Sequence, residues 1–175
     1  MKKSIPILLA AISLMSFTGM TSYAQVAKNN AQAGSTNEDG IFLKTTNGTS
    51  GVVNEKAQRN FKRDYRNADA VEWFNLTDNS LMSRFTMNGI LHRAFYSAHG
   101  QWIATVSGYG ADKLDKGLYD KIKSLYYNSS IVFVNQIDKL GGKTIYVVDI
   151  QDEKYIRKLL LDDDEIEIFQ EFEKQ

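Results

Sequence analysis

Two histidines, His92 and His99, are the side chains best suited to acid–base chemistry near neutral pH. His99 stands two residues after Ser97, and a serine activated by a histidine is the centre of nucleophilic hydrolysis. The sequence has no Gly-x-Ser-x-Gly elbow, and a catalytic triad is defined by geometry rather than by the presence of its residue types. We interpret both histidines as strand or turn residues and assign no catalytic residue.

Two further motifs contain the residue types of ligand sites. Gly108-Tyr109-Gly110 joins an extended segment to a helical one, as a dinucleotide loop does, but Lys113 stands where a third glycine is required. The acidic run 162–165 has the charge of a calcium loop, yet such loops need alternating ligands and a glycine at the sixth position. We interpret the first motif as a turn of the chain and the second as a solvated hairpin turn. No metal and no cofactor is therefore expected.

The charge and cysteine content exclude several classes of protein. Among the 175 residues, 21 Lys and Arg balance 21 Asp and Glu, so no global field attracts nucleic acid. The absence of cysteine excludes disulfides, a thiolate nucleophile and cysteine-based metal sites. Residues 151–175 hold nine acidic and four basic side chains, which we interpret as a solvated acidic edge strand, with a docking feature as the alternative.

The N-terminal residues 1–24 have the pattern of an export signal. Lys2 and Lys3 precede a short apolar run at 5–17, and Ser22-Tyr23-Ala24 offers small residues where a signal peptidase cleaves. A retained membrane anchor is the alternative, but a membrane span needs about 20 apolar residues. We expect cleavage near Ala24, a periplasmic or secreted protein without membrane insertion, and a flexible tether at 25–53, which is rich in Ala, Asn, Gly, Ser and Thr.

From Asn54 onward, hydrophobic periodicity predicts regular elements. Asn54 can cap a helix whose apolar residues Ala57, Phe61 and Tyr65 recur every four positions. A second helix is predicted after Gly110, with an apolar stripe formed by Leu114, Leu118, Ile122 and Leu125. Extended segments follow each helix, at 70–76, 80–87, 90–98 and 101–107, and at 131–137, 144–150, 155–161 and 165–172.

The order of the elements is a helix and four strands, twice. Residues 61 positions apart are similar, as in Tyr65 with Tyr126 and Asn67 with Asn128, which suggests a duplicated unit. Links of two to six residues between strands are too short for parallel crossovers. We therefore expect an α+β domain at 54–175, made of two tandem helix-plus-four-strand antiparallel units at 54–110 and 111–175.

Asn88-Gly89 between two apolar runs predicts a hairpin with a two-residue turn. This register assigns one face of the hairpin to the core and points the alternate residues away. On the outward face, Arg84 then lies opposite Arg93, and Met82 lies opposite Phe95. Two opposed Arg side chains must meet water or an acidic partner, so these four residues form a candidate partner surface, with an ordinary solvent-exposed face as the alternative.

The chain also resembles a known family over about 54–173. The similarity is carried by Tyr-Arg-Asn-Ala-Asp-Ala-Val-Glu-Trp at 65–73 and by shorter matches at Ser83-Arg84-Phe85, Asn88-Gly89, Ala94-Phe95-Tyr96, Gly100-Gln101-Trp102, Ile122, Tyr126-Tyr127 and 145–148. On these residues, the domain resembles the PepSY-like, beta-lactamase-inhibitor-like family of small exported bacterial proteins. The resemblance implies tandem α/β units and a binding or inhibitory role toward secreted enzymes such as hydrolases. It supplies no catalytic residues.

These observations favour an exported, non-catalytic binding protein, not an enzyme, that inhibits or modulates a secreted or periplasmic hydrolase. Its expected partner is another envelope or secreted protein, not nucleic acid. The alternative is a small α+β enzyme or a small-ligand-binding protein of the periplasm that uses Asp or Glu carboxylates. A deep pocket with a buried carboxylate would favour that alternative, whereas an open aromatic sheet favours binding.

The position of the export signal gives a first prediction. The exported protein is expected to begin at Gln25 and to be recovered in a soluble envelope fraction, because the apolar run is too short to remain as an anchor. Intact-mass measurement of the exported protein checks this. Retention of residues 1–24 together with the membrane fraction would contradict it.

Overall fold

The computed structural model describes residues 53–76, 78–163 and 165–175. The predicted export signal and all of the predicted tether except Val53 lie outside these ranges. Neither helix in the described part of the chain is long and apolar enough to cross a membrane.

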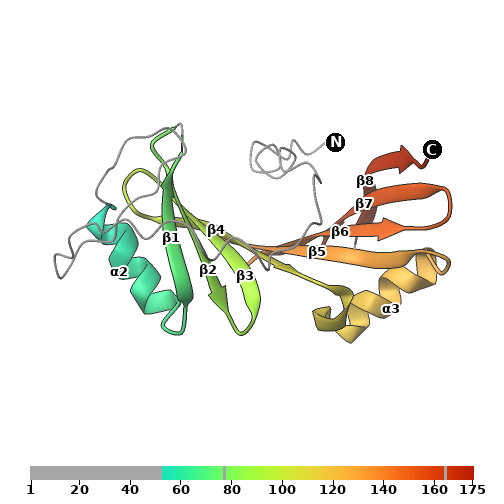
Figure 1. Cartoon of the computed structure of the whole chain (residues 1–175), viewed down its shortest axis with the longest axis horizontal. Coiled ribbons are helices and arrows are strands. Elements are labelled where there is room, and N and C mark those ends of the chain that lie inside the picture. Colours follow the sequence, from blue (N-terminus) through green and yellow to red (C-terminus); the bar gives the residue numbers. More distant parts are fainter. Residues whose placement is uncertain (1–52, 77, 164) are drawn as a thin grey trace, which may run out of the picture. The chain divides into compact units, whose positions relative to one another are not determined.

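The described elements follow one another with short links (Figure 1). Helix α2 (Glu55–Asp64) precedes four strands, β1 (Asp69–Asn75), β2 (Leu81–Met87), β3 (Ile90–Tyr96) and β4 (Trp102–Tyr109). A 3₁₀ turn η1 (Ala111–Lys113) and helix α3 (Lys116–Leu125) then lead to the last four strands, β5 (Ser130–Lys139), β6 (Thr144–Gln151), β7 (Tyr155–Asp162) and β8 (Glu165–Glu173).

The eight strands form a single antiparallel sheet in chain order, so the prediction of two tandem helix-plus-four-strand units is wrong. Strand β4 pairs directly with β5, from Ala104 opposite Lys139 to Tyr109 opposite Val134. The reason is that an unpaired strand edge leaves its N–H and C=O groups without partners, and β5 satisfies this edge of β4. Local periodicity carries no information about which strands pair across a helix.

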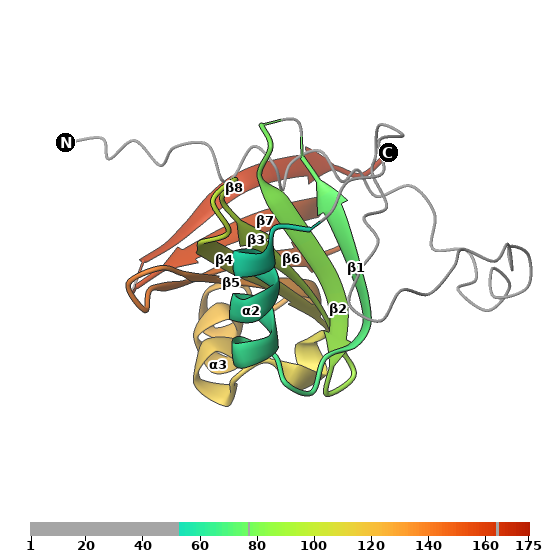
Figure 2. The ribbon, with the colours of Figure 1, turned by 90° about the vertical axis from the view of Figure 1, so that its left-hand side faces the viewer.

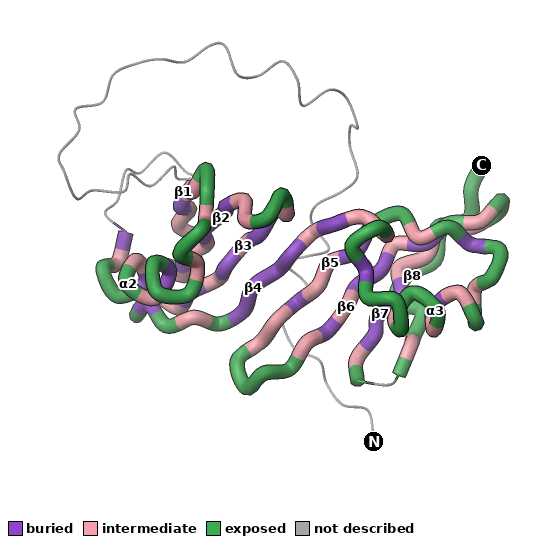
Figure 3. The backbone as a smooth tube through the Cα atoms, turned by 90° about the horizontal axis from the view of Figure 1, so that it is seen from below, coloured by how far each residue is buried: buried purple, intermediate pink, exposed green. Residues whose placement is uncertain are grey.

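Both helices pack on the same face of this sheet (Figures 1 and 2). Ala57 and Phe61 of α2 join a buried cluster with Trp73, Phe85 and other side chains of β1–β3. Ile122 of α3 joins a second buried cluster with side chains of β4–β7. Figure 3 shows how buried positions alternate with exposed or half-buried ones along several strands. Within the described residues, the opposite face carries no helix, and we call it the helix-free face.

The two helices begin and end in the same way. Asn54 accepts hydrogen bonds from the backbone N–H groups of Lys56 and Ala57, which confirms the predicted cap of the first helix. Asp115 caps α3 by the same pattern, and each helix ends at a tyrosine, Tyr65 or Tyr126, with nearly equal backbone angles. The apolar stripe of α3 buries Ile122 but not Leu125, which is 60 % exposed.

The hairpin register predicted from Asn88-Gly89 is confirmed. Both turn residues have positive φ, and Met87 pairs with Ile90. The face that this register assigns to the core is buried at Leu81, Ser83, Phe85, His92, Ala94 and Tyr96 and partly buried at Met87 and Ile90.

The first helix is docked on the turn between β3 and β4. The side-chain nitrogen of Asn60 donates to the carbonyl oxygen of Gly100 at 2.9 Å, and that of Asn54 donates to the carbonyl oxygen of Ala98 at 3.2 Å. Gly100 has a φ of +74°, and a Cβ atom there would lie 2.6 Å from the backbone nitrogen of Ala57. This turn therefore needs a glycine both for its backbone angle and for the approach of α2.

Replacing Gly100 with alanine should destabilise the domain more than the same change at Gly141, which has a φ of +91° but no atom within 4 Å of its Cβ position. Backbone strain alone should cost about 1–2 kcal/mol at each site. The contact with α2 should add about 1–3 kcal/mol at Gly100. Urea unfolding of both variants measures the difference. Equal losses would show that α2 does not press on this turn.

Candidate functional site

The structure brings the four residues of the predicted partner surface together on the helix-free face. Arg84 of β2 lies directly opposite Arg93 of β3, and Met82 lies opposite Phe95. The Arg84 side chain is 49 % exposed, and the other three residues are half-buried. The alternation of side chains across the confirmed register places all four on one side of the hairpin, away from α2.

An acidic residue that the sequence analysis missed lies beside them. Glu72 of β1 pairs opposite Arg84, and the Arg84 Nε donates to a Glu72 carboxylate oxygen at 2.8 Å. The Arg84 guanidinium also lies 5.7 Å from the centre of the Phe74 ring. Glu72 and Phe74 flank the buried Trp73 in the sequence, so the alternation of side chains along a strand could have placed both on this face. The charge of Arg84 is thus matched by Glu72.

The second guanidinium is in a different electrostatic environment. Burial lowers the pKa of Arg93, and the charge of Arg84 lowers it further, although an Arg side chain stays protonated in proteins. The two positive groups repel because they stand directly opposite each other on adjacent strands.

The middle of the same face is aliphatic. Arg93 lies opposite Val106, Val106 opposite Ile137, and Ile137 opposite Ile145, so one row crosses four strands. Val106, Ile137 and Ile145 are buried but belong to neither of the two helix-side clusters. The face therefore changes along this row from charged side chains on β1–β3 to aliphatic ones on β4–β6.

A close contact fixes an aromatic side chain on this face. Gly108 of β4 lies opposite Leu91 on one side and Asn135 on the other. A Cβ atom at Gly108 would lie 2.9 Å from the Phe133 ring, so the ring occupies the space that glycine leaves. Leu91 is 42 % exposed and Phe133 is 37 % exposed. Together with Met82 and Phe95, they give this face a partly exposed apolar component.

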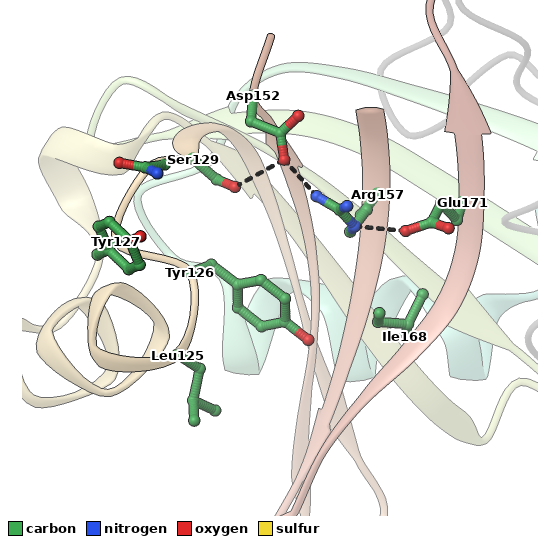
Figure 4. Close-up of a pocket in the computed structure, with 9 residues that line it drawn as sticks. Leu125, Tyr126, Tyr127, Ser129, Asp152, Arg157, Ile168 and Glu171 are labelled. Atoms are coloured by element: carbon green, nitrogen blue, oxygen red, sulfur yellow. Dashed lines mark hydrogen bonds and ion pairs between the residues drawn. The ribbon is translucent and has the colours of Figure 1, made fainter. Parts of the chain in front are cut away.

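A separate hollow of about 280 Å³ lies between the C-terminal end of α3 and strands β7 and β8 (Figure 4). Arg157 stands in it between two acids: its Nε donates to Glu171 at 2.5 Å, and its Nη1 donates to Asp152. Backbone N–H donation from Tyr155, followed by the Arg157 hydrogen bond, lowers the pKa of Asp152 to about 2. The other residues that line the hollow are Leu125, Tyr126, Tyr127, Asn128, Ser129 and Ile168.

Local sequence patterns do not predict this hollow, because its residues come from α3, β7, β8 and the segments that follow α3 and β6. In the sequence, only the Tyr126-Tyr127 pair pointed to it, because Leu125 belonged to the predicted apolar stripe of the second helix.

The histidines do not form an accessible reactive site. His92 is buried, its ring stacks on Phe85, and its Nδ1 lies 2.9 Å from the Ser107 hydroxyl. Burial lowers the pKa of His92, but Ser107 is itself only 7 % exposed, so a substrate carbonyl does not reach it. His99 is exposed on the β3–β4 turn. Over the residues that the structure describes, no three His, Asp or Glu side chains gather as metal ligands.

Comparison with known proteins gives similarity at the level of the fold. No family model matches the chain, and no curated protein matches it. A solved DUF2874 family protein from Bacteroides ovatus ATCC 8483 is 20 % identical, with a TM-score of 0.56 over 67 % of this chain and 85 % of that chain. A BLIP-like protein from Bacteroides fragilis NCTC 9343 is 19 % identical, with a TM-score of 0.55 over 68 % of this chain and 84 % of that one.

A third structure, from Bacteroides eggerthii DSM 20697, is provisionally described as periplasmic. It is 14 % identical, with a TM-score of 0.55 over 70 % of this chain and 90 % of that chain. None of these three structures is described as PepSY-like. They therefore support the beta-lactamase-inhibitor-like (BLIP-like) part of the resemblance and not its PepSY-like part. The described part of the chain has a BLIP-like fold, one eight-stranded antiparallel sheet with two helices.

Proposed function

We propose that this chain is an exported, non-catalytic protein that binds another envelope or secreted protein through the helix-free face of β2 and β3. The observation that carries the proposal is the composition of this face: two adjacent guanidinium groups, Arg84 and Arg93, stand beside Met82 and Phe95. Arg, Met and aromatic residues are enriched at protein interfaces, and paired Arg side chains suit an acidic partner.

The finer parts of the proposal rest on similarity and on the N-terminal sequence. The signal-like residues 1–24 and a structural neighbour provisionally described as periplasmic support export to the periplasm or beyond. The BLIP-like neighbour supports a hydrolase as the class of partner, with inhibition or modulation as the outcome of binding. Fold similarity alone does not establish an activity, so the binding surface is the part to test first.

Removing both charges, in an Arg84→Gln and Arg93→Gln double variant, should abolish capture of the partner from a native envelope extract. Capture should fall because the partner's carboxylates lose their counter-charges. The melting temperature should change by only about 3–6 °C, because a half-exposed ion pair such as Arg84–Glu72 contributes at most about 1 kcal/mol. Mass spectrometry of the captured proteins and calorimetry measure the two effects.

A matched control removes two Arg charges from the other side of the domain. Arg59 and Arg63 of α2 also form ion pairs, with Glu55 and Asp64, and both are well exposed. The Arg59→Gln and Arg63→Gln double variant should capture the same proteins as the unmodified chain. If both double variants lose the same proteins, binding depends on net charge alone and the proposed surface is wrong. If neither loses them, the partner binds elsewhere.

A further inference from the structure

Strand β8 is one edge of the sheet. Among the described residues it pairs only with β7, so the N–H and C=O groups on its other side bond to no strand there. Three of its large apolar side chains are exposed: Ile168 at 49 %, Phe169 at 41 % and Phe172 at 52 %. The opposite edge strand, β1, has seven residues against nine in β8, and none of the exposed large apolar side chains of the described chain lies on it. Strand β8 is therefore the edge better suited to accept a further strand.

The register of β7 and β8 assigns the side chains of residues 165–168 to the two faces of the sheet. Ile166 and Ile168 lie opposite two leucines of β7 that belong to the buried cluster beside α3. Glu165 and Glu167 therefore point to the helix-free face, and both are exposed. Over these four residues, the edge presents acids on one face and aliphatic side chains on the other.

The acids at this end of β8 outnumber the cations beside them. Glu165 lies opposite Asp162, and Lys143 Nζ stands 2.7 Å from Asp162 and 3.5 Å from Asp163. Within the described residues, neither Glu165 nor Glu167 has an ion pair of its own. These five side chains, which we call the acidic corner, carry four negative charges and one positive charge, a net charge of −3.

The other cations of β7, β8 and the turn before them lie away from the acidic corner or contact other groups. These contacts are Lys158 with Asp149, Arg157 with Asp152 and Glu171, and Lys174 with the carbonyl oxygen of Asp152. Lys154 precedes Tyr155, which pairs with Glu173 at the opposite end of the hairpin. The acidic corner therefore favours a basic neighbour over an acidic one.

A second copy of the chain does not suit this edge. Antiparallel pairing of two β8 strands about Phe169 would place Glu167 opposite Glu171 and Glu165 opposite Glu173. Parallel pairing in register would place each glutamate opposite its own copy. Like charges directly opposite each other destabilise a strand pair.

We propose that the edge of β8 at residues 165–168 pairs with an extended segment of a partner protein in which basic and apolar residues alternate. The side chains of an added strand alternate between the two faces as those of β8 do. Lys or Arg therefore lies beside Glu165 and Glu167 on the helix-free face, and apolar residues lie beside Ile166 and Ile168. The site differs in charge and in strands from the β2–β3 surface and does not rest on the function proposed for it.

Three capped peptides test the proposal by NMR titration of the full chain: Thr-Lys-Val-Lys-Val-Thr, Thr-Glu-Val-Glu-Val-Thr and Thr-Lys-Lys-Val-Val-Thr. The third keeps the composition of the first but puts its two lysines on opposite faces of a strand. The first peptide should shift the amide signals of residues 165–168. It should bind about tenfold more tightly than the Glu peptide, because two ion pairs form, and more tightly than the third.

Pairing through the backbone has a separate test. Only alternate residues of a strand bond to a given neighbour. Two further versions of the first peptide carry N-methyl groups on both lysines or on both valines. One of them should lose binding, and the other should keep it.

Variants of the chain test the role of the two acids. Glu165→Gln with Glu167→Gln should remove the preference for the Lys peptide over the Glu peptide. The matched control, Glu153→Gln with Glu173→Gln, removes two exposed acidic charges at the other end of the hairpin and should keep the preference.

Several outcomes would overturn the proposal. Equal affinity of the three capped peptides, or of the two methylated ones, would show that no strand pairs with this edge. Absence of shifts at residues 165–168 would place binding elsewhere, and loss of the preference in both double variants would reduce it to net charge. Self-association of the free chain that broadens the signals of residues 165–168 would assign the edge to a second copy. None of these results bears on capture through Arg84 and Arg93, so the two proposals fail independently.

Discussion

The pairing of β4 with β5 is the contact on which the arrangement of the rest of the domain depends. Side chains alternate along a strand, so the register of a ladder decides which residues of both strands share a face. Ser107 lies opposite Gln136 and Tyr109 opposite Val134, which places the helix-facing residues of β4 and β5 on one side. Because of this register, α2 and α3 cover the same face of one continuous sheet.

The two faces therefore have different chemistry. The helix-bearing face buries two apolar clusters. His92 is buried on this face, where its ring stacks on Phe85 and its Nδ1 contacts the Ser107 hydroxyl. The helix-free face carries the pair Arg84 and Arg93 on one half and a buried aliphatic row on β4–β6. The charged and aromatic side chains on the β2–β3 half of the helix-free face are the basis of the proposed protein recognition.

The parts of the fold encoded by short sequence signals were predictable. Asn54 as a helix cap and Asn88-Gly89 as a hairpin turn each act over a few residues, and the hairpin turn fixed the register that brings Arg84 opposite Arg93. The single sheet was not predictable, because the pairing of β4 with β5 joins strands separated by η1 and α3.

The candidate sites were also predictable to different degrees, because some of their residues lie close together in the sequence and others do not. Four residues of the β2–β3 surface followed from one hairpin, but Glu72 required the β1–β2 register, which shifts between Asp69 and Glu72. The hollow joins the end of α3 to β7 and β8, and in the sequence only the Tyr126-Tyr127 pair pointed to it. Contacts between elements distant in sequence depend on the tertiary fold, which local patterns do not specify.

Site-specific photo-crosslinking in cells that export the protein tests binding through the helix-free face most directly. A benzophenone side chain would replace Leu91 on that face or Tyr119 on α3, two positions with similar exposures of 42 % and 39 %. Binding through the helix-free face predicts a discrete adduct of higher mass from position 91 and none from position 119. An adduct from position 119 alone, or the same adduct from both positions, would contradict binding through that face.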